Sequence, residues 1–205
     1  MAVTTGKIGI CNAALIRLGE ITIVDFTEAS LQATACSLLW DSSRREMLQS
    51  HPWNFAIARS SWTAATESGG LARTASATPV NKEYKYEYTL PTDCIKLLKV
   101  YYDYDYKVEG RLIMTDTEEC HIKYVTDIED TTLFTPMFRK VMESKMAYEL
   151  AYTVVRGEGM ITQMYTLLER NIEIAKAMDS QEDISDPIDQ FESSFITTRY
   201  SGRGR

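Results

Sequence analysis

Alternating hydrophobic and polar positions mark the centre of the chain, in residues 83–101. Tyr84, Tyr86 and Tyr88 are separated by polar residues, which is the two-residue period of a strand that is buried on one face. Pro91 then interrupts the pattern, because proline has no backbone N–H to donate and restricts the residue before it. An apolar run resumes three residues later. The segment therefore predicts two strands joined by a proline corner.

Shorter patterns around this segment predict further strands. The candidates are alternating or apolar runs at residues 53–57, 106–108, 111–114 and 121–125. Glu109-Gly110 separates the second run from the third, as in a two-residue hairpin turn. Residues 60–82 are rich in Ser, Thr, Ala and Gly, so we expect a mobile loop there. The middle of the chain, residues 51–133, is therefore expected to form a small antiparallel β subdomain.

Apolar residues at a helical period begin near the N-terminus. Thr4 and Thr5 can cap a first helix, which is expected to end at Gly19. A second helix is expected from a cap at Thr27 to Ser50, where a His-Pro pair stops it.

The second predicted helix has two apolar faces. One face carries Leu31, Ala35, Leu38 and Leu39, and the other, roughly opposite, carries Cys36, Trp40 and Met47. A helix that is apolar on two sides is either central in a bundle or shared with a neighbouring subunit.

Two more helices are expected after the strands. Thr135-Pro136 provides a cap and a first-turn proline for the third helix, and residues 147–155 of that helix are apolar nearly all round. The fourth helix has the clearest apolar stripe of the chain, formed by Ile161, Met164, Tyr165, Leu168, Ile172 and Ala175.

This order of helices, strands and helices predicts an α+β fold. We expect a bundle of about four helices, built from residues 1–50 and 134–178, with the β subdomain between them in the sequence. The second face of the second helix and the apolar half of the third would supply surface for neighbouring subunits. The predicted inter-subunit residues are Cys36, Trp40, Met47, Ala151 and Val154.

The C-terminal residues change character twice. Residues 179–190 contain five acidic residues and no basic one, which indicates a solvated linker. Residues 191–205 then combine aromatic side chains with arginines, which favours a docking arm over a core segment; a frayed tail is the alternative. The predicted arm residues are Phe191, Phe195, Ile196, Arg199, Tyr200, Arg203 and Arg205.

Composition narrows the classes of function. The 205 residues carry a net charge of −7, which argues against tight binding to nucleic-acid phosphates. The four cysteines are far apart and are expected to be buried free thiols. No His/Cys spacing typical of a zinc site and no phosphate-binding motif occurs, so we expect no metal, no cofactor and no enzymatic activity. The N-terminus lacks the pattern of a signal peptide, so we expect assembly in a cytoplasm.

Several blocks of the sequence resemble, in order, those of a known family. They are ICNAALIRLGE at residues 10–20, the stretch 40–59 with its WNFA segment, the tyrosine segment 83–101, FTPMFRK at 134–140 and MAYELA at 146–151. Together they resemble the tail tubular protein A family, the head-to-tail adaptors of short-tailed bacteriophages.

The resemblance implies a structural role in a virion. Family members form dodecameric rings below the portal, so the partners implied here are copies of the same chain, a portal protein and a tail nozzle resembling tail tubular protein B. DNA would pass through the ring without specific binding. Because related adaptors dock C-terminal segments on their portals, the resemblance implies that the arm binds the portal, while the β subdomain and its loop at 60–82 would face the nozzle.

Two other functions stay open at this point. Some related tail proteins have been suggested to act on cell walls, so a virion-associated cell-wall or polysaccharide hydrolase is the main alternative. A cytoplasmic interaction module unrelated to phages is the other.

Overall fold

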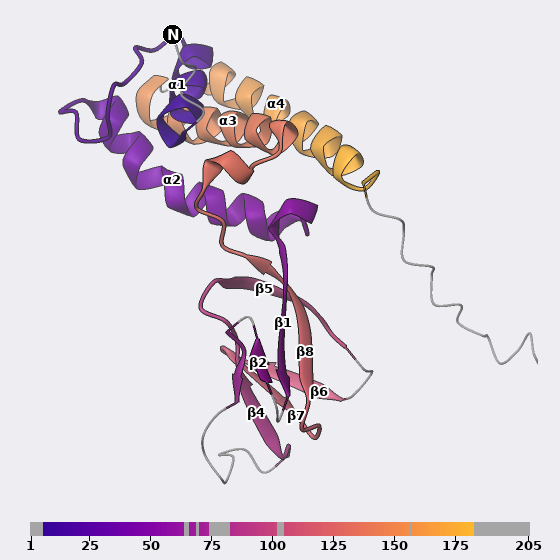
Figure 1. The fold of residues 1–205 in the computed structure, drawn as a ribbon. Helices are drawn as coiled ribbons and strands as arrows, with labels where there is room; N and C mark the ends of the chain where they lie inside the picture. Colours follow the sequence, from indigo (N-terminus) through magenta and orange to yellow (C-terminus); the bar gives the residue numbers. More distant parts are fainter. Residues whose placement is uncertain are drawn as a thin grey trace, which may run out of the picture.

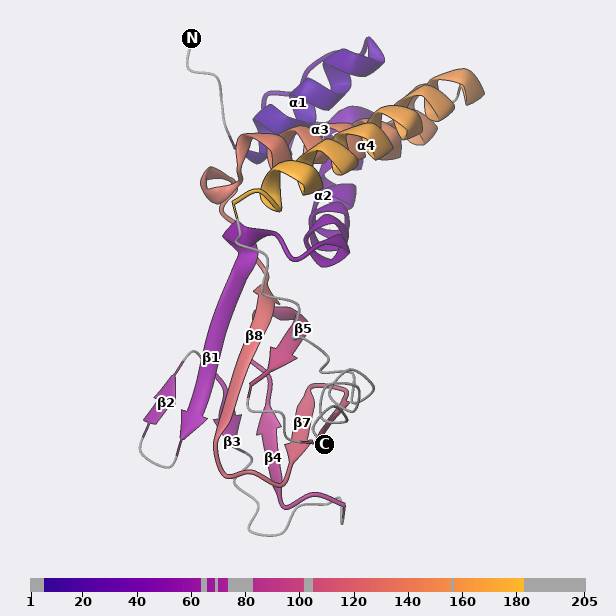
Figure 2. The same cartoon turned by 90° about the vertical axis from the view of Figure 1, so that its right-hand side faces the viewer.

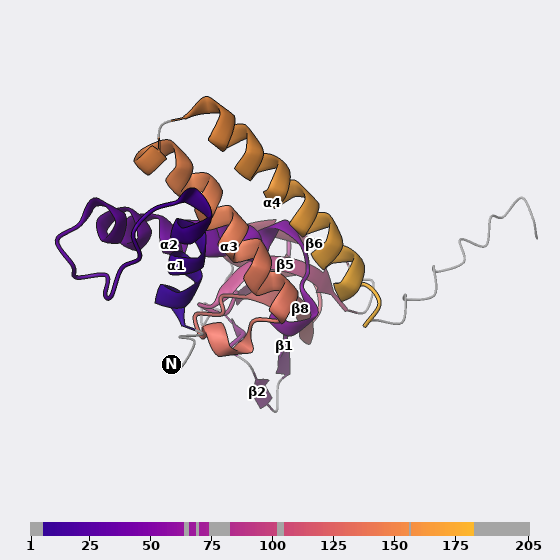
Figure 3. The same cartoon turned by 90° about the horizontal axis from the view of Figure 1, so that it is seen from above.

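The computed structural model describes residues 6–63, 66–68, 70–73, 83–101, 105–155 and 157–182. These residues form an α+β protein whose α-helices gather at one end and whose strands gather at the other (Figure 1). Helices from both ends of the chain lie side by side (Figure 3). We call residues 7–50 and 136–179 the helical body, and residues 57–126 the β sandwich.

Helix α1 spans Lys7–Leu18. It ends as predicted at Gly19, which has a φ of 76° and donates its N–H to carbonyls of the last turn. Glycine adopts this left-handed conformation without the steric cost that a Cβ brings. The residue before the helix is Gly6, and the predicted caps Thr4 and Thr5 lie outside the described residues.

Helix α2 spans Leu31–Ser50 and begins three residues later than predicted. Its cap is Ser30, whose hydroxyl accepts a hydrogen bond of 3.2 Å from the N–H of Ala33. The predicted cap, Thr27, is wrong, because its hydroxyl instead donates to the carboxylate of Asp25 at 2.6 Å. The connector between the two helices, residues 19–30, is consequently longer than the sequence pattern suggested.

Helix α3 spans Pro136–Leu150, and its predicted cap is confirmed. The hydroxyl of Thr135 accepts a hydrogen bond of 3.3 Å from the N–H of Phe138. The apolar second half does not continue as an α-helix, because Ala151–Val155 forms a π-helical turn. Helix α4, Glu158–Asp179, then runs back along α3 (Figure 3).

The helices share one hydrophobic core. Its largest buried side chains include Ile10, Leu15, Trp40, Leu48, Trp53, Phe138, Met142 and Met146. Phe138 lies edge-on to Trp53, with ring centroids 5.1 Å apart, and to Phe134, at 4.9 Å. Val125 and Ile128, at and just beyond the end of the last strand, also reach this core and tie the two parts of the molecule together.

Two four-stranded antiparallel sheets make up the β sandwich (Figure 2). The first has the order β2 Thr66–Ser68, β1 Ile57–Thr63, β8 Cys120–Thr126 and β5 Cys94–Val100. The second has the order β3 Ala72–Arg73, β4 Tyr86–Thr89, β7 Leu112–Thr115 and β6 Tyr106–Glu109. Their shared core contains Trp62, Leu71, Tyr88, Leu90, Ile113, Ile122 and Tyr124.

The proline corner is confirmed and has a larger role than the sequence indicated. The two strands that it joins, β4 and β5, lie in different sheets. Before the corner, the N–H of Leu90 still bonds to Arg111 O at 2.9 Å, and after it the N–H of Cys94 bonds to Pro91 O at 3.0 Å. The corner therefore carries the chain across the sandwich.

Three expectations for the strands are corrected. Asn54–Ala56 is a 3-10 turn rather than a strand, because the neighbouring Trp53 is buried in the helical core. The hairpin turn centres one residue later than predicted, at Gly110-Arg111, since Glu109 pairs with Leu112. Residues 60–82 are not one continuous loop: they contain the end of β1 and strands β2 and β3, while residues 74–82 lie outside the described residues.

Candidate subunit-contact surfaces and the junction

Large apolar side chains are exposed on α1, on the connector and on the first half of α2. We call this set the connector patch; its members are Ile16, Ile21, Val24, Leu31 and Leu38. Val24 is 86% exposed and Leu38 is 75% exposed. Leu31 and Leu38 are seven residues apart and therefore lie on the same side of α2. A set of exposed apolar residues of this size is typical of a surface that another protein covers.

A second exposed set lies on the opposite flank of the helical body. Ile174 and Met178 are exposed on the C-terminal half of α4, and the half-buried Leu167 continues their stripe. We call these three residues the α4 patch. The connector and the C-terminal half of α4 lie on opposite sides of the helical body in both Figure 1 and Figure 3. The two patches consist of different residues on different elements.

The structure places most of the predicted inter-subunit residues inside the single chain. Cys36, Trp40, Met47 and Ala151 are all buried in the core of the single chain. Val154 is half-buried and packs against the same core. The side chains of Cys36, Trp40 and Met47 therefore leave little surface for a neighbour, and contacts of α2 with another subunit would use its opposite face, where Leu31 and Leu38 are exposed.

The physical reason lies in two polar residues on the core face of α2. Ser43 and Arg44 lie between Trp40 and Met47 and are both buried, so the core stripe does not look continuous in the sequence. Arg44 is 1% exposed, and its cation is neutralised by Asp127, which lies 83 residues away. A charge can occupy a core position only when such a partner exists, and a local pattern cannot reveal that partner.

Asp127 forms one of two carboxylate ties between the helical body and the β sandwich. It lies just after β8 and pairs with Arg44 and, at 2.8 Å, with Arg45 of α2. Arg44 also donates to Ile128 O at 2.8 Å. The end of the last strand is thereby fixed to the middle of α2.

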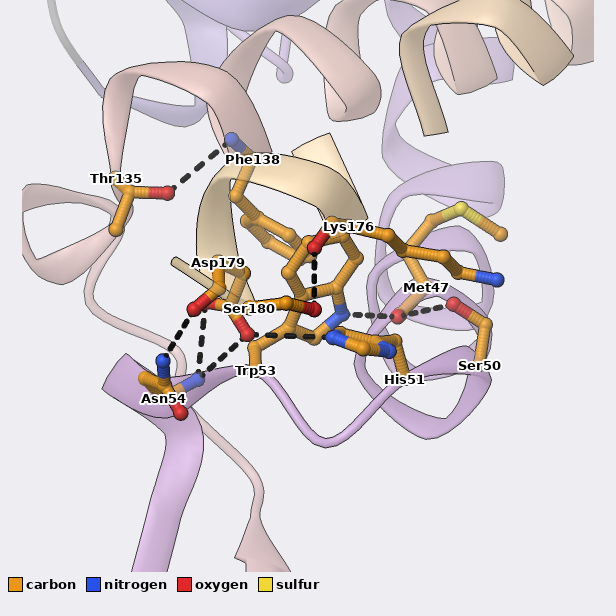
Figure 4. A network of polar contacts seen from close by, with 10 residues as sticks. All are labelled: Met47, Ser50, His51, Trp53, Asn54, Thr135, Phe138, Lys176, Asp179 and Ser180. Carbon is orange, nitrogen blue, oxygen red and sulfur yellow. Dashed lines mark hydrogen bonds and ion pairs between the residues drawn. The ribbon is translucent and has the colours of Figure 1, made fainter. Parts of the chain in front are cut away.

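Asp179 forms the second tie, at the end of α4 (Figure 4). Its carboxylate accepts the backbone N–H of Asn54 at 3.1 and 3.2 Å and lies 3.2 Å from His51 Nε2. The side-chain amide of Asn54 donates in return to Asp179 O at 2.7 Å, while Trp53 Nε1 donates to Met47 O at 2.8 Å. The sequence pattern had placed Asp179 in a solvated linker, whereas the structure buries it.

The thiol groups of the chain lie in the protein interior. All four cysteines are buried and free. A hydrogen bond with Cys36, together with burial, raises the pKa of Cys11 well above its ordinary value, and burial raises that of Cys120 to about 12. Thiols with raised pKa values remain protonated at neutral pH and are poor nucleophiles. No group of three or more potential metal ligands occurs among the residues searched, which are the described ones.

The predicted arm, residues 191–205, lies outside the described residues, as does most of the predicted linker. Among the helices that the structure describes, none is long and apolar enough to cross a bilayer. Neither the comparison with protein-family models nor that with curated proteins finds a match for this chain.

Proposed function

We propose that this chain is the subunit of a head-to-tail adaptor ring, a structural virion protein that joins a portal to a tail nozzle. The observation that carries the proposal is the pair of exposed apolar patches on opposite flanks of the helical body. A ring built from identical subunits uses a heterologous contact, in which one surface of each subunit meets a different surface of the next. The connector patch and the α4 patch would supply those two surfaces.

The energetics favour contact between the patches. Removing a large aliphatic side chain from water contributes about 1.5–3 kcal/mol when burial is complete. The connector patch alone has five such side chains, each more than half exposed. Association costs translational and rotational freedom, so one contact can be weak on its own. A closed ring makes the contact at every subunit, which increases the stability of the whole.

The resemblance of the sequence blocks to the tail tubular protein A family supplies the rest of the proposal. The four described helices would act as a bundle that forms the ring body, with twelve copies as the family resemblance implies. The β sandwich would extend from that body toward the nozzle, residues 191–205 would bind the portal, and DNA would pass through the ring without specific binding.

The test is to place a charge on each patch separately. Leu38→Glu changes the connector patch and Met178→Glu changes the α4 patch, while both side chains are exposed in the single chain. We expect both variants to keep the wild-type free energy of unfolding within about 0.5 kcal/mol. Light scattering after size-exclusion chromatography, with and without portal rings, should show loss of the ring. Gln49→Glu, an exposed change in the last turn of α2, eleven residues beyond Leu38, is the matched control and should preserve the ring.

An equimolar mixture of the two patch variants tests the heterologous geometry. Each Leu38→Glu chain keeps its α4 patch and each Met178→Glu chain keeps its connector patch, so the mixture can form one intact contact and no ring. We expect a heterodimer from the mixture and monomers from each variant alone. If the wild-type protein remains monomeric even with portal rings present, the proposed function is wrong.

A further inference from the structure

A row of three cations crosses the first sheet of the β sandwich. Arg59 of β1 lies opposite Lys123 of β8, and Lys123 lies opposite Lys99 of β5. The row is on the outer face, because the alternate positions of these strands, such as Trp62 and Ile122, face the sandwich core. Side chains at directly opposed positions are about 5 Å apart, and like charges placed there destabilise a sheet.

The cations of this row have no anionic partner among the described residues. None of the ion pairs that the structure shows includes Arg59, Lys99 or Lys123. The nearby carboxylates have other partners: Asp127 pairs with α2, and Asp93 accepts a hydrogen bond of 2.6 Å from Thr126. The repulsion within the row is thus not offset by a carboxylate of the described residues.

Tyr101 holds the two outer cations of the row in place. Its hydroxyl accepts a hydrogen bond of 2.6 Å from Arg59. Its ring centroid lies 5.6 Å from the Arg59 guanidinium carbon and 5.7 Å from Lys99 Nζ. Both contacts are within the range of cation–π attraction. The positive charges therefore stay together on one small part of the sheet.

The acidic end of the chain begins next to this face. Asp179 is hydrogen-bonded to Asn54, and Figure 2 shows the end of α4 directly above the start of β1. Arg59 is five residues beyond Asn54, at most about 17 Å along the chain, whereas the seven residues 183–189 can span up to about 23 Å. Residues 182–189 contain four acidic residues and no Lys or Arg.

We propose that the acidic segment 182–189 docks on the row formed by Arg59, Lys123 and Lys99 of its own chain. The charges of the segment and the row are complementary, and the attachment of Asp179 to Asn54 places the segment within reach. Docking would relieve the repulsion within the row. The proposal does not depend on ring formation.

Hydrogen exchange in the full-length protein tests the docking. In the wild-type protein at about 0.05 M salt, we expect the amides of residues 183–190 to exchange about five- to tenfold more slowly than in a double variant, Lys99→Glu with Lys123→Glu. Raising the salt to about 0.5 M should remove the difference, because exposed charges are then screened. A triple variant should lose the protection of these amides in the same way. Its substitutions are Asp183→Asn, Asp186→Asn and Asp189→Asn.

The matched control is Lys85→Glu with Lys140→Glu, which makes the same change in net charge at exposed positions away from the first sheet. This control should retain wild-type protection. Equal exchange in the wild-type and the Lys99/Lys123 variant would overturn the proposal. Protection that increases with protein concentration would also overturn it, because the segment would then dock on a neighbouring copy.

A labelled DNA duplex tests the competing occupant. If the acidic segment covers the row, fluorescence anisotropy at low salt should show weaker DNA binding to the wild-type protein than to the triple Asp→Asn variant. Substituting Lys99 and Lys123 in that variant should then remove the gain. If the wild-type protein binds DNA through the row as tightly as the triple variant does, the row is a nucleic-acid site and the proposal fails.

Discussion

The helical body and the β sandwich bury polar groups in different ways. The helical body contains buried cations and a buried carboxylate, namely Arg44, Lys145 and Asp179, each with a partner of opposite charge or a hydrogen-bond donor. The β sandwich also buries the carboxylate of Glu87, on β4, but its core contains the tyrosines Tyr88 and Tyr124. The hydroxyl of Tyr88 donates to Glu118 O at 2.7 Å, and that of Tyr124 lies 3.4 Å from the Asp93 carboxylate.

This difference indicates which part of the molecule needs the other for the pairing of its buried polar groups. The closest anionic partner of Arg44 is Asp127, at the sandwich end of the junction, whereas Asp41 of the same helix is exposed and lies 3.7 Å away. The buried charge of the helical body therefore gains its close partner only when both parts are assembled. The tyrosines of the sandwich find their partners within the sandwich. We therefore expect the stability of the helical body to depend on the β sandwich more than the stability of the sandwich depends on the helical body. Three substitutions test this comparison, in order of decreasing effect.

Asp127→Asn should have the largest effect. The change keeps the shape of the side chain but leaves Arg44, which is 1% exposed, without its close anionic partner. Removing one member of a buried pair costs about 3–5 kcal/mol. Urea unfolding followed by circular dichroism should show this loss.

Arg45→Gln is the matched control, because Arg45 pairs with the same carboxylate but is 61% exposed. An exposed pair contributes about 0–1 kcal/mol, so the control should be close to wild type. Equal losses for the two variants would mean that burial of Arg44 does not decide the strength of this tie.

Tyr124→Phe should have an intermediate effect that depends on pH. Burial, with a smaller contribution from Asp93, raises the pKa of Tyr124 to about 12. The phenol of an unfolded chain titrates near pH 10. Between about pH 10 and 12, the unfolded chain has released a proton that the folded chain still binds, so the free energy of unfolding falls as pH rises. Below pH 10 this contribution to stability is fully present.

Unfolding experiments at a series of alkaline pH values measure this dependence. Tyr124→Phe should cost about 1 kcal/mol at pH 7, as expected for a lost hydrogen bond, and should show a shallower decline above pH 10. An unchanged slope would show that the sandwich does not hold the Tyr124 phenol in its neutral form.

Sequence patterns identified most of the fold. The cap at Thr135, the end of α1 at Gly19 and the strand predicted at residues 121–125 follow from local rules, and the structure shows them, with the strand one residue longer at each end. The errors occur where distant contacts override local preference. Trp53 would fit a strand, but its ring is buried against Phe138 of α3, so the chain turns before β1 begins.

The candidate contact surfaces were harder to predict. The sequence shows that α2 has two apolar faces, but choosing the exposed one requires knowing that Arg44 lies inside the core with Asp127 as its partner. The cation row illustrates the same limit, since Arg59, Lys99 and Lys123 come together only through the strand order of the first sheet. Residue patterns describe one element at a time, whereas both features depend on pairs of elements.

Lys145→Met should have the smallest effect at neutral pH, although Lys145 is as buried as many core residues. Burial alone would lower the pKa of Lys145, but hydrogen bonds and charge attraction from Glu149 and Glu46 raise it above its ordinary value. These two carboxylates are partly exposed, so they return to water when the amine is removed, and the methionine fills the space of the lysine stem. We therefore expect the free energy of unfolding to change by no more than about 1 kcal/mol at pH 7.

The stabilisation from the raised pKa of Lys145 is present below about pH 10 and is lost at higher pH. The free energy of unfolding of Lys145→Met should therefore fall less steeply above pH 10 than that of the wild-type protein. A loss at pH 7 as large as that of Asp127→Asn would contradict the comparison, because it would show that the helical body depends on a charge pair formed entirely within itself.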